Sequence, residues 1–185
     1  MVSFVLNDKD NTSRTLTIAA DEAVRLGAPL LVASSGGDTA VAALHAAREK
    51  GIVDRLYIIS SVYGSRGPGS NGMKDDCKKE LDAANVRIIT AAHVLSGAER
   101  AMSTKFRGIY PSEIIAHTLR MFSQGVKVAV EIAAMALDAG AITYGAPAVA
   151  VGGTGRGADT ATVLTPAYTQ DIFATKIHEI LCKPY

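Results

Sequence analysis

The stretch "PLLVASSGGDTAVAALHAAREKG", residues 29–51, indicates the fold class because it joins a strand to a helix through a short glycine-containing loop. Residues 29–35 are almost uninterruptedly apolar, which is typical of a strand buried on both faces. Residues 36–51 read as a helix that ends in a basic turn, with Gly51 as its C-cap. A strand followed directly by a helix is the repeating unit of a parallel α/β sheet.

The same strand-then-helix order continues on both sides of this stretch. Further apolar runs predict strands at residues 2–6, 55–63, 86–92 and 147–153. Helical spacing predicts helices over residues 11–27, 73–85, 112–122 and 127–139, and residues 93–110 read as an irregular polar segment. Because the strands are apolar along nearly their whole length, we expect them to be buried on both faces.

The stretch "VGGTGRGADTATVLTPA", residues 151–167, predicts a hairpin at the end of this pattern. A glycine-rich turn follows the strand at 147–153, and residues 160–169 alternate threonine with apolar side chains, as a strand with one exposed side would. A hairpin makes the new strand antiparallel to an otherwise parallel sheet. Residues 175–185 are a candidate for one further strand.

These elements predict an α/β fold: a three-layer α/β/α sandwich whose mainly parallel sheet carries an antiparallel edge strand. A chain of 185 residues suits one core, and neither a repeat nor a linker marks a second domain, so residues 1–185 are expected to form a single domain. The helix at 127–139 is apolar nearly all round. It is therefore either central to the sandwich or packed against a second subunit, and we expect a homo-oligomer.

Composition excludes several classes of function. A formal charge of +1 provides no global field that would attract nucleic acid or an anionic membrane. No apolar run approaches the roughly 20 residues of a membrane span, and a cytoplasmic protein is the expectation. The two cysteines, Cys77 and Cys182, lie far apart without a CxxC motif, so neither a metal site nor a disulfide framework is indicated.

Four loops are expected to meet at the carboxyl edge of the parallel strands, where α/β sheets bind their ligands. They are "SSGGDT" (34–39), "VYGSRGPGSNG" (62–72), "HVLSGAER" (93–100) and the glycine hairpin. The first is the best anion site, because it enters a helix whose leading N–H groups and dipole favour negative charge. Asp38 complicates this interpretation, since its carboxylate would repel a phosphate unless turned away. A purely structural capping loop is the alternative.

Two glycine-rich segments resemble nucleotide-binding motifs but give only weak evidence for them. "GPGSNG" (67–72) matches GxGxxG, but it lies several residues past its strand and no acidic residue ends the next strand, so a plain glycine-rich loop is favoured. Tyr63 and Gly64 before it are still expected to line the crevice. The hairpin fails the Walker pattern, because Ala158 and Asp159 follow Gly157.

A few ionisable residues are candidates for chemistry. His93 ends its strand at the crevice edge, where an imidazole can exchange a proton, although most isolated histidines are structural. Glu131 interrupts an apolar helix and would need a partner if it were buried; the alternative is that it faces water. Arg100, Lys105 and Arg107 form a basic patch that suits either a phosphate clamp or a solvated face.

The order of elements resembles the C-terminal α/β domain of pyruvate kinase. In that domain a strand runs through Thr-x-Ser-Gly-x-Ser-Ala into a helix, and this loop holds an effector phosphate in the regulated enzymes. "SSGGDTA" matches it at Ser34, Gly37, Thr39 and Ala40 and departs from it elsewhere. "TGRGADTA" resembles the glycine-rich loop that also touches the effector. The 185 residues hold no barrel domain of the kind that carries the kinase active site, so pyruvate kinase activity is not expected.

A family of free-standing archaeal and bacterial proteins with this fold and uncharacterised function is similar to the chain in the segments "VASSGGDTA", "HVLSGAERAMSTKFRG", "VEIAAMALDAGAI" and "GGTGRGADTATVLTPA". Relatives are associated with bound flavin mononucleotide (FMN), so the resemblance implies that this phosphate-bearing flavin occupies the crevice. The residues expected to hold the ligand are Ser34, Ser35, Gly36, Gly37, Asp38, Thr39, Tyr63, Gly64, His93, Ser96, Gly97, Arg100, Thr154, Arg156, Gly157, Asp159 and Thr160.

Three functions stay open at the level of sequence. The first is a binding domain for a phosphorylated ligand or flavin, which includes a flavin enzyme. The second is a non-enzymatic regulatory module that senses a phosphorylated metabolite, as the similar domain does inside pyruvate kinase. The third, a transferase or hydrolase that uses His93 and Glu131, rests on position alone.

Overall fold

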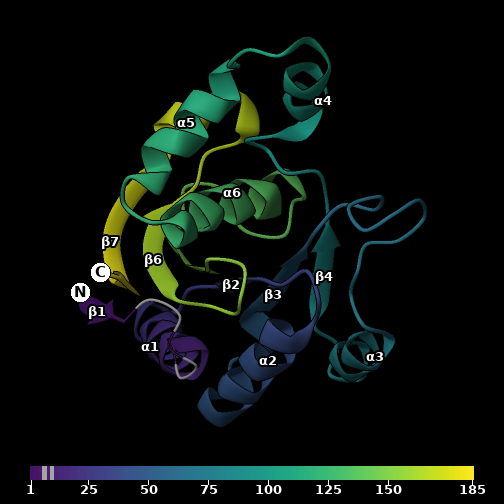
Figure 1. The fold of residues 1–185 in the computed structure, drawn as a ribbon. Helices are drawn as coiled ribbons and strands as arrows, with labels where there is room; N and C mark the ends of the chain where they lie inside the picture. Colours follow the sequence, from purple (N-terminus) through teal and green to yellow (C-terminus); the bar gives the residue numbers. More distant parts are fainter. Residues whose placement is uncertain (6–7, 9–10) are drawn as a thin grey trace.

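The computed structural model describes residues 1–5, 8 and 11–185 of the chain (Figure 1). The strands are β1 (Val2–Phe4), β2 (Leu30–Ala33), β3 (Leu56–Ser60), β4 (Arg87–Thr90), β5 (Ala148–Gly152), β6 (Thr160–Thr165) and β7 (Lys176–Pro184). The helices are α1 (Asn11–Leu26), α2 (Asp38–Lys50), α3 (Asp75–Ala83), α4 (Gly97–Phe106), α5 (Pro111–Arg120) and α6 (Gln124–Asp138), with short 3-10 turns η1 (Val53–Arg55) and η2 (Thr169–Ala174). The end of the predicted strand at 2–6 lies outside the described residues.

One mixed sheet with the order β1-β7-β6-β5-β2-β3-β4 forms the centre of the described chain. The four strands β5, β2, β3 and β4 are parallel, as predicted from their apolar sequences. β6 is antiparallel to β5, which confirms the predicted hairpin, and the terminal segment does add a strand, β7. β7 and β1 pair beyond β6, so the antiparallel strand does not end the sheet.

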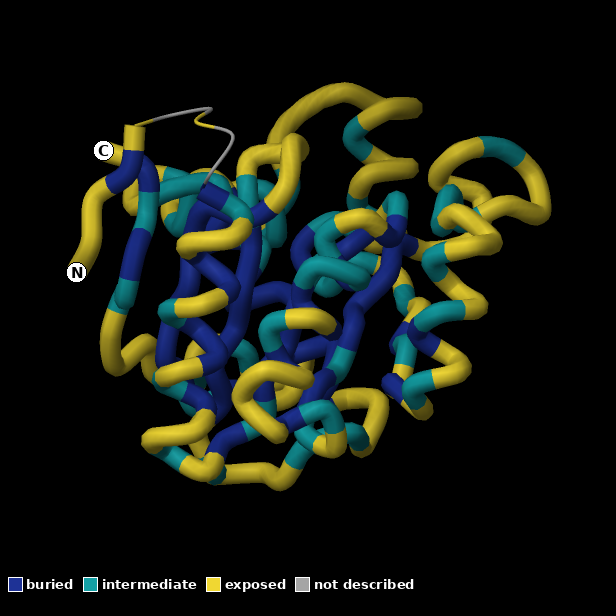
Figure 2. The backbone as a smooth tube through the Cα atoms, turned by 90° about the horizontal axis from the view of Figure 1, so that it is seen from below, coloured by how far each residue is buried: buried dark blue, intermediate teal, exposed yellow. Residues whose placement is uncertain are grey.

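Helices cover both faces of the sheet, which confirms an α/β fold (Figures 1 and 2). On one face α1 and α2 pack Leu16 and Leu44 against strand residues such as Ile58. On the other face α6 packs Ala129 and its neighbours against residues such as Leu31. Consecutive strand residues therefore enter different cores, which is why the strand sequences are apolar without alternation.

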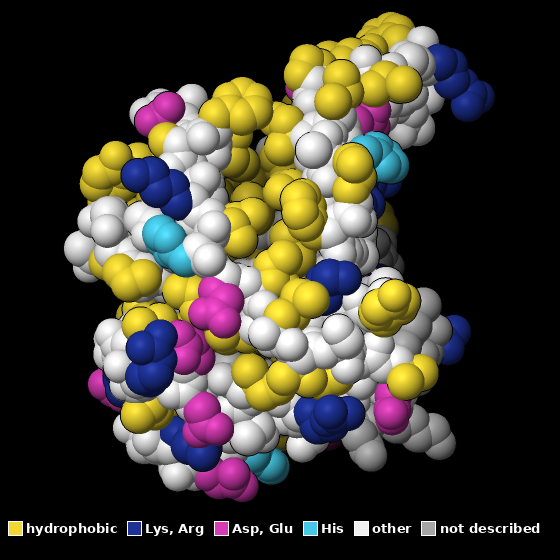
Figure 3. Space-filling model, turned by 90° about the vertical axis from the view of Figure 1, so that its left-hand side faces the viewer, with side chains coloured by type: hydrophobic (Ala, Val, Ile, Leu, Met, Phe, Trp, Pro, Cys, Tyr) yellow, Lys and Arg dark blue, Asp and Glu magenta, His cyan; other side chains and the backbone are white. Residues whose placement is uncertain are grey.

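The surroundings of α6 decide between the two explanations for its apolar sequence. α6 lies between the sheet and α5, and twelve of its residues, from Gly125 to Leu137, are buried. A central position in the fold accounts for the pattern, so the pattern gives no evidence for a second subunit. Hydrophobic side chains do gather in a hollow on the side of the molecule where α5 and β7 lie (Figure 3). The homo-oligomer stays a prediction.

Three expectations about individual segments are wrong. Residues 97–106 form α4 and are not irregular; no residue of α4 is buried, so hydrophobic periodicity could not reveal it. β4 is an edge strand in which only Ile89 is buried, so it is not covered on both faces. β6 has no exposed face, because α6 packs on one of its faces and α1 on the other; five of its six residues are buried.

Among the described residues, no helix has the length and apolar character needed to cross a membrane.

Candidate functional site

A cavity of about 630 Å³ lies where the strand order reverses, between the carboxyl ends of β2 and β5. From β2 the chain proceeds through β3 to β4 on one side, and from β5 it proceeds through β6 to β7 on the other. Loops diverge at such a switch point and leave a crevice. The cavity is lined by Thr12, Ala33, Ser34, Ser35, Gly36, Gly37, Asp38, Thr39, Ile59, Ser60, Ser61, Arg66, His93, Gln124, Val128, Ile132, Gly153, Gly155, Arg156 and Gly157.

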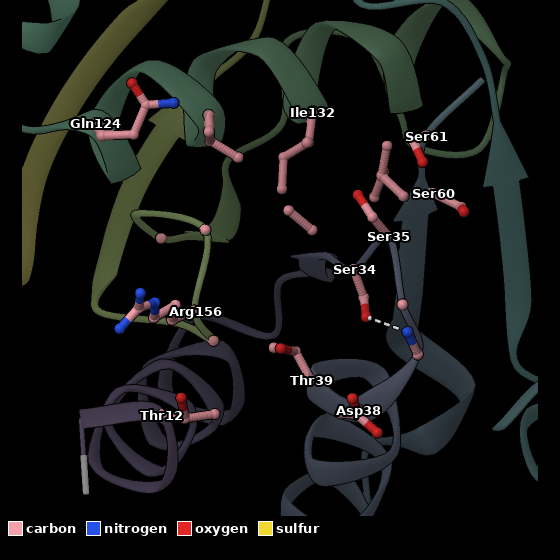
Figure 4. A pocket seen from close by; sticks show the side chains of 18 of the residues that line it. Thr12, Ser34, Ser35, Asp38, Thr39, Ser60, Ser61, Gln124, Ile132 and Arg156 are labelled. Atoms are coloured by element: carbon pink, nitrogen blue, oxygen red, sulfur yellow. Dashed lines mark hydrogen bonds between the residues drawn. The ribbon is translucent and has the colours of Figure 1, made fainter. Parts of the chain in front are cut away.

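The loop 34–39 forms one wall with the start of α2 (Figure 4). Ser34 Oγ accepts hydrogen bonds from the N–H groups of Gly37 and Ala40, each at 3.2 Å. Ser34 therefore satisfies two of the donors that a helix start leaves open. Within the described part of the chain, the N–H groups of Asp38 and Thr39 have no acceptor. These donors remain available to a ligand in the cavity.

Gly37 allows this loop to pass close to α3. Its φ of 103° lies in the left-handed region, and a Cβ at this position would lie 2.5 Å from Cys77 Cβ. Gly36, by contrast, has open space where a Cβ would be. The two glycines therefore differ in purpose: Gly37 is required by the packing of the loop, and Gly36 leaves room on the side of the cavity.

Asp38 is paired with a cation, which answers the objection that it would repel an anion. Lys74 Nζ donates to Asp38 Oδ1 at 2.7 Å and to Oδ2 at 2.8 Å. The hydrogen bond with this carboxylate raises the pKa of Lys74 above its ordinary value. The negative charge of Asp38 is thus offset locally, while Arg66 and Arg156 on the cavity wall are not paired with an acid in the described residues.

The glycine hairpin between β5 and β6 forms a second wall and is fixed to the start of α1. The N–H of Ala158 donates to Thr12 Oγ1 at 3.1 Å. A Cβ on Gly157 would collide with the same hydroxyl, so this contact requires glycine. Arg156 is exposed, and its guanidinium points away from Ser34 and Thr39 (Figure 4). Its side chain would have to turn in order to meet an anion at the start of α2.

Asp159 fastens the other side of the hairpin to the start of α6. Its carboxylate accepts hydrogen bonds from the hydroxyls of Thr154 and Thr160, the latter at 2.7 Å. Thr160 Oγ1 also lies 3.2 Å from the hydroxyl of Ser123, which caps α6 by accepting from the N–H of Val126. These residues support the wall and do not line the cavity themselves.

Glu131, His93 and Lys127 form a cluster behind the third wall, which is made by α6. Glu131 is fully buried, and its Oε2 lies 3.2 Å from Nδ1 of His93 and within hydrogen-bond distance of Lys127 Nζ. Its Oε1 accepts from the N–H of Leu95 at 3.1 Å. Burial alone would raise the pKa of Glu131, but the hydrogen bond with His93 and the charge of Lys127 outweigh burial and lower it.

The structure brings about half of the predicted site residues together. The cavity wall includes Ser34, Ser35, Gly36, Gly37, Asp38, Thr39, His93, Arg156 and Gly157. The predicted residues that do not line it are Tyr63, Gly64, Ser96, Gly97, Arg100, Thr154, Asp159 and Thr160. Tyr63 borders a separate cavity of about 360 Å³ beside α3, and Ser96, Gly97 and Arg100 belong to the start of α4.

Sequence reasoning missed a set of lining residues on α1 and α6 and on the loop after β3. Gln124, Val128 and Ile132 recur every four residues, so they share one face of α6, and Ile132 points into the cavity (Figure 4). This spacing was a usable signal, but it also suits an ordinary core helix. Thr12, Ser61 and Arg66 carry no sequence pattern that separates them from other polar residues of the chain.

No model of a known protein family matches the chain. Among the described residues, no group of three or more histidine, cysteine, aspartate and glutamate side chains could hold a metal ion.

Proposed function

We propose that the cavity at the switch point binds a small molecule through its phosphate group, with the phosphate on the N-terminus of α2. The observation that carries this proposal is the set of unpaired N–H donors of Asp38 and Thr39 in the wall of a cavity of about 630 Å³. A helix start provides both these donors and a favourable dipole for an anion. The Asp38–Lys74 pair and the two cavity arginines support the proposal, because they leave the local charge positive.

FMN is the ligand that we propose for this site. The cavity volume lies within the range of about 300–1,000 Å³ that is usual for small-molecule sites. Ile59, Val128 and Ile132 supply an apolar wall away from the start of α2, which suits an isoalloxazine ring better than a sugar. The similarity of "SSGGDTA" and the glycine hairpin to the C-terminal domain of pyruvate kinase is part of the same proposal. It is supported by the order of the parallel strands and the antiparallel β6.

The second candidate function is a regulatory module that senses a phosphorylated metabolite. It would use the same phosphate site at the N-terminus of α2. A thermal-shift screen that compares sugar phosphates with flavins separates the two, because a ligand that binds the native state raises the melting temperature. The class of compound that raises the melting temperature more is the class to which the ligand belongs. A melting temperature that no compound of either class changes contradicts both proposed functions.

Calorimetric titration with FMN and with riboflavin, which lacks the phosphate, tests the proposed function. We expect FMN to bind at least about tenfold more tightly than riboflavin, since hydrogen bonds to a charged group contribute about 1.5–3 kcal/mol. Thr39→Val keeps the backbone N–H but removes the hydroxyl that Thr39 adds to the cavity wall (Figure 4), so it should reduce this difference in part. Thr17→Val, on the exposed side of α1, should not change it. Arg156→Ala should weaken FMN binding, with Arg48→Ala, at an exposed position of α2 outside the cavity wall, as its control. Equal affinities for FMN and riboflavin contradict phosphate recognition.

A further inference from the structure

His93 is held in one orientation at the cavity wall. Its Nδ1 lies 3.2 Å from Oε2 of Glu131, and the main-chain carbonyl of His93 accepts the N–H groups of Ser96 and Gly97 at 3.2 and 2.8 Å. Ring and backbone are therefore both fixed. The side chain nevertheless remains 41% exposed, since the ring reaches the cavity, whereas the carboxylate behind it is 1% exposed.

The charge of Glu131 determines which ring nitrogen carries the proton. An ionised carboxylate only accepts hydrogen bonds, so Nδ1 of a neutral His93 must be the donor. Nε2 then has a free lone pair, and within the described residues it has no protein partner. A histidine whose one nitrogen is held by a buried carboxylate, and whose other nitrogen is open to a ligand, is arranged for proton transfer.

The positive charge of Lys127 offsets the negative charge of Glu131 behind His93. Its side chain is 8% exposed and bonds the same carboxylate, so the buried lysine and glutamate together carry no net charge. When Nε2 takes up a proton, the site gains one positive charge beside Glu131. The other charged groups around the cavity are Asp38, offset by Lys74, and the arginines Arg66 and Arg156. A bound phosphate would balance the arginines.

We propose that the cavity is a site of acid–base catalysis, in which His93 Nε2 removes a proton from a phosphorylated substrate and Glu131 and Lys127 are positioning residues. FMN has no carbon-bound proton next to a carbonyl, so the substrate takes the place of FMN on the same phosphate anchor. The proposal rests on the proposed phosphate anchor at α2. Within the described residues no hydroxyl or thiol is hydrogen-bonded to His93 Nε2, so this nitrogen is not engaged by a nucleophile as it is in a catalytic triad, and we assign the proton to the ligand.

The substrate class follows from which protons need a catalyst. Protons on oxygen exchange with water without help, whereas a proton on carbon next to a carbonyl requires a base. As Nε2 takes this proton, the C–H electron pair forms a carbon–carbon double bond and the carbonyl electrons move onto oxygen. The imidazolium then returns the proton to the ligand. Atoms and electrons balance without an oxidant or a second reactant, and the substrate is a phosphorylated carbonyl compound.

Exchange of carbon-bound hydrogen for deuterium, followed by proton NMR in D₂O, tests the proposal with dihydroxyacetone phosphate as the probe. Binding of inorganic phosphate is measured first on the same protein. We expect the wild type to exchange the probe's C–H at least about 100-fold faster than buffer, and His93→Gln to lose that increase. The matched control is His45→Gln, which removes the same ring from an exposed His–Glu pair at the same 3.1–3.2 Å spacing.

The two failures are distinguishable. Phosphate binding together with exchange at the buffer rate overturns the acid–base proposal and leaves the proposed function intact. No phosphate binding overturns both. Exchange in His93→Gln at the wild-type rate also overturns the role of His93.

The positioning role of Glu131 has a readout that does not depend on turnover. In nitrogen-15 NMR of the ligand-free wild type, we expect His93 to carry its proton on Nδ1, and Glu131→Gln to remove this tautomer preference while His45 stays unchanged. A wild-type His93 that carries its proton on Nε2 overturns the assignment, even where the Glu131 variant fails to fold.

Discussion

Lys74 donates to both carboxylate oxygens of Asp38, at 2.7 and 2.8 Å, across the gap between the loop that enters α3 and the start of α2. The pair lies beside the N–H donors to which we assign the phosphate. A carboxylate in this first turn would otherwise occupy the same dipole as the ligand. Lys74 therefore offsets the charge of Asp38 at the proposed phosphate site, although Lys74 itself does not line the cavity.

Lys74→Gln should weaken the binding of inorganic phosphate by about two- to fivefold, because an exposed pair contributes little and is screened by salt. Asp38→Asn should strengthen it by a similar factor, and the double variant should bind like the wild type. Titrations at low and high salt check this. An unchanged affinity in both single variants at low salt contradicts the role given to the pair.

The two neighbouring glycines predict opposite results for stability. Gly37→Ala should lower the free energy of unfolding by more than about 1 kcal/mol, since it combines a positive φ with a collision against Cys77. Gly36→Ala is the matched control and should be close to neutral, because open space surrounds its Cβ position. Urea unfolding measures both. Equal losses in the two variants would show that the loop does not pack on α3 as described.

The fold was more accessible to sequence reasoning than the site. Residues such as Leu31 and Ile58 face different cores from neighbouring strands, and an uninterrupted apolar run reports this burial directly. α4 buries nothing, so it left no periodic signal. Asp159 illustrates the limit for the site: its sequence position suggested a ligand contact, but it bonds Thr154 and Thr160 instead. Such choices depend on side-chain partners that sequence spacing does not specify.

Because Glu131 and Lys127 form a buried ion pair, the effects of substituting them on the free energy of unfolding should be strongly non-additive. Lys127→Met leaves a buried carboxylate without its cation and should cost about 3–5 kcal/mol of unfolding free energy. Lys127→Met combined with Glu131→Gln removes both charges and should recover most of that loss. A double-mutant cycle by urea unfolding measures the difference. Additive effects would contradict a buried, charge-balanced pair.

The lowered pKa of Glu131 predicts how stability changes in acid. Because the pKa is lower in the folded than in the unfolded state, the group stabilises the fold above its ordinary pKa of 4.5, and this contribution is lost as pH falls through the folded value. Between about pH 5 and about pH 3 the wild type should lose more unfolding free energy than Glu131→Gln. Parallel acid profiles of the two proteins would contradict an ionised Glu131 in the core.

Both proposals require an anion at the N-terminus of α2, and a titration of the nitrogen-15-labelled protein with inorganic phosphate is the decisive test. We predict saturable shifts of the backbone amides of Gly36, Asp38 and Thr39, with the amides of α3 and α5 unaffected. Unchanged amide shifts at residues 36–39, or shifts confined to another helix, would show that phosphate does not bind at the start of α2.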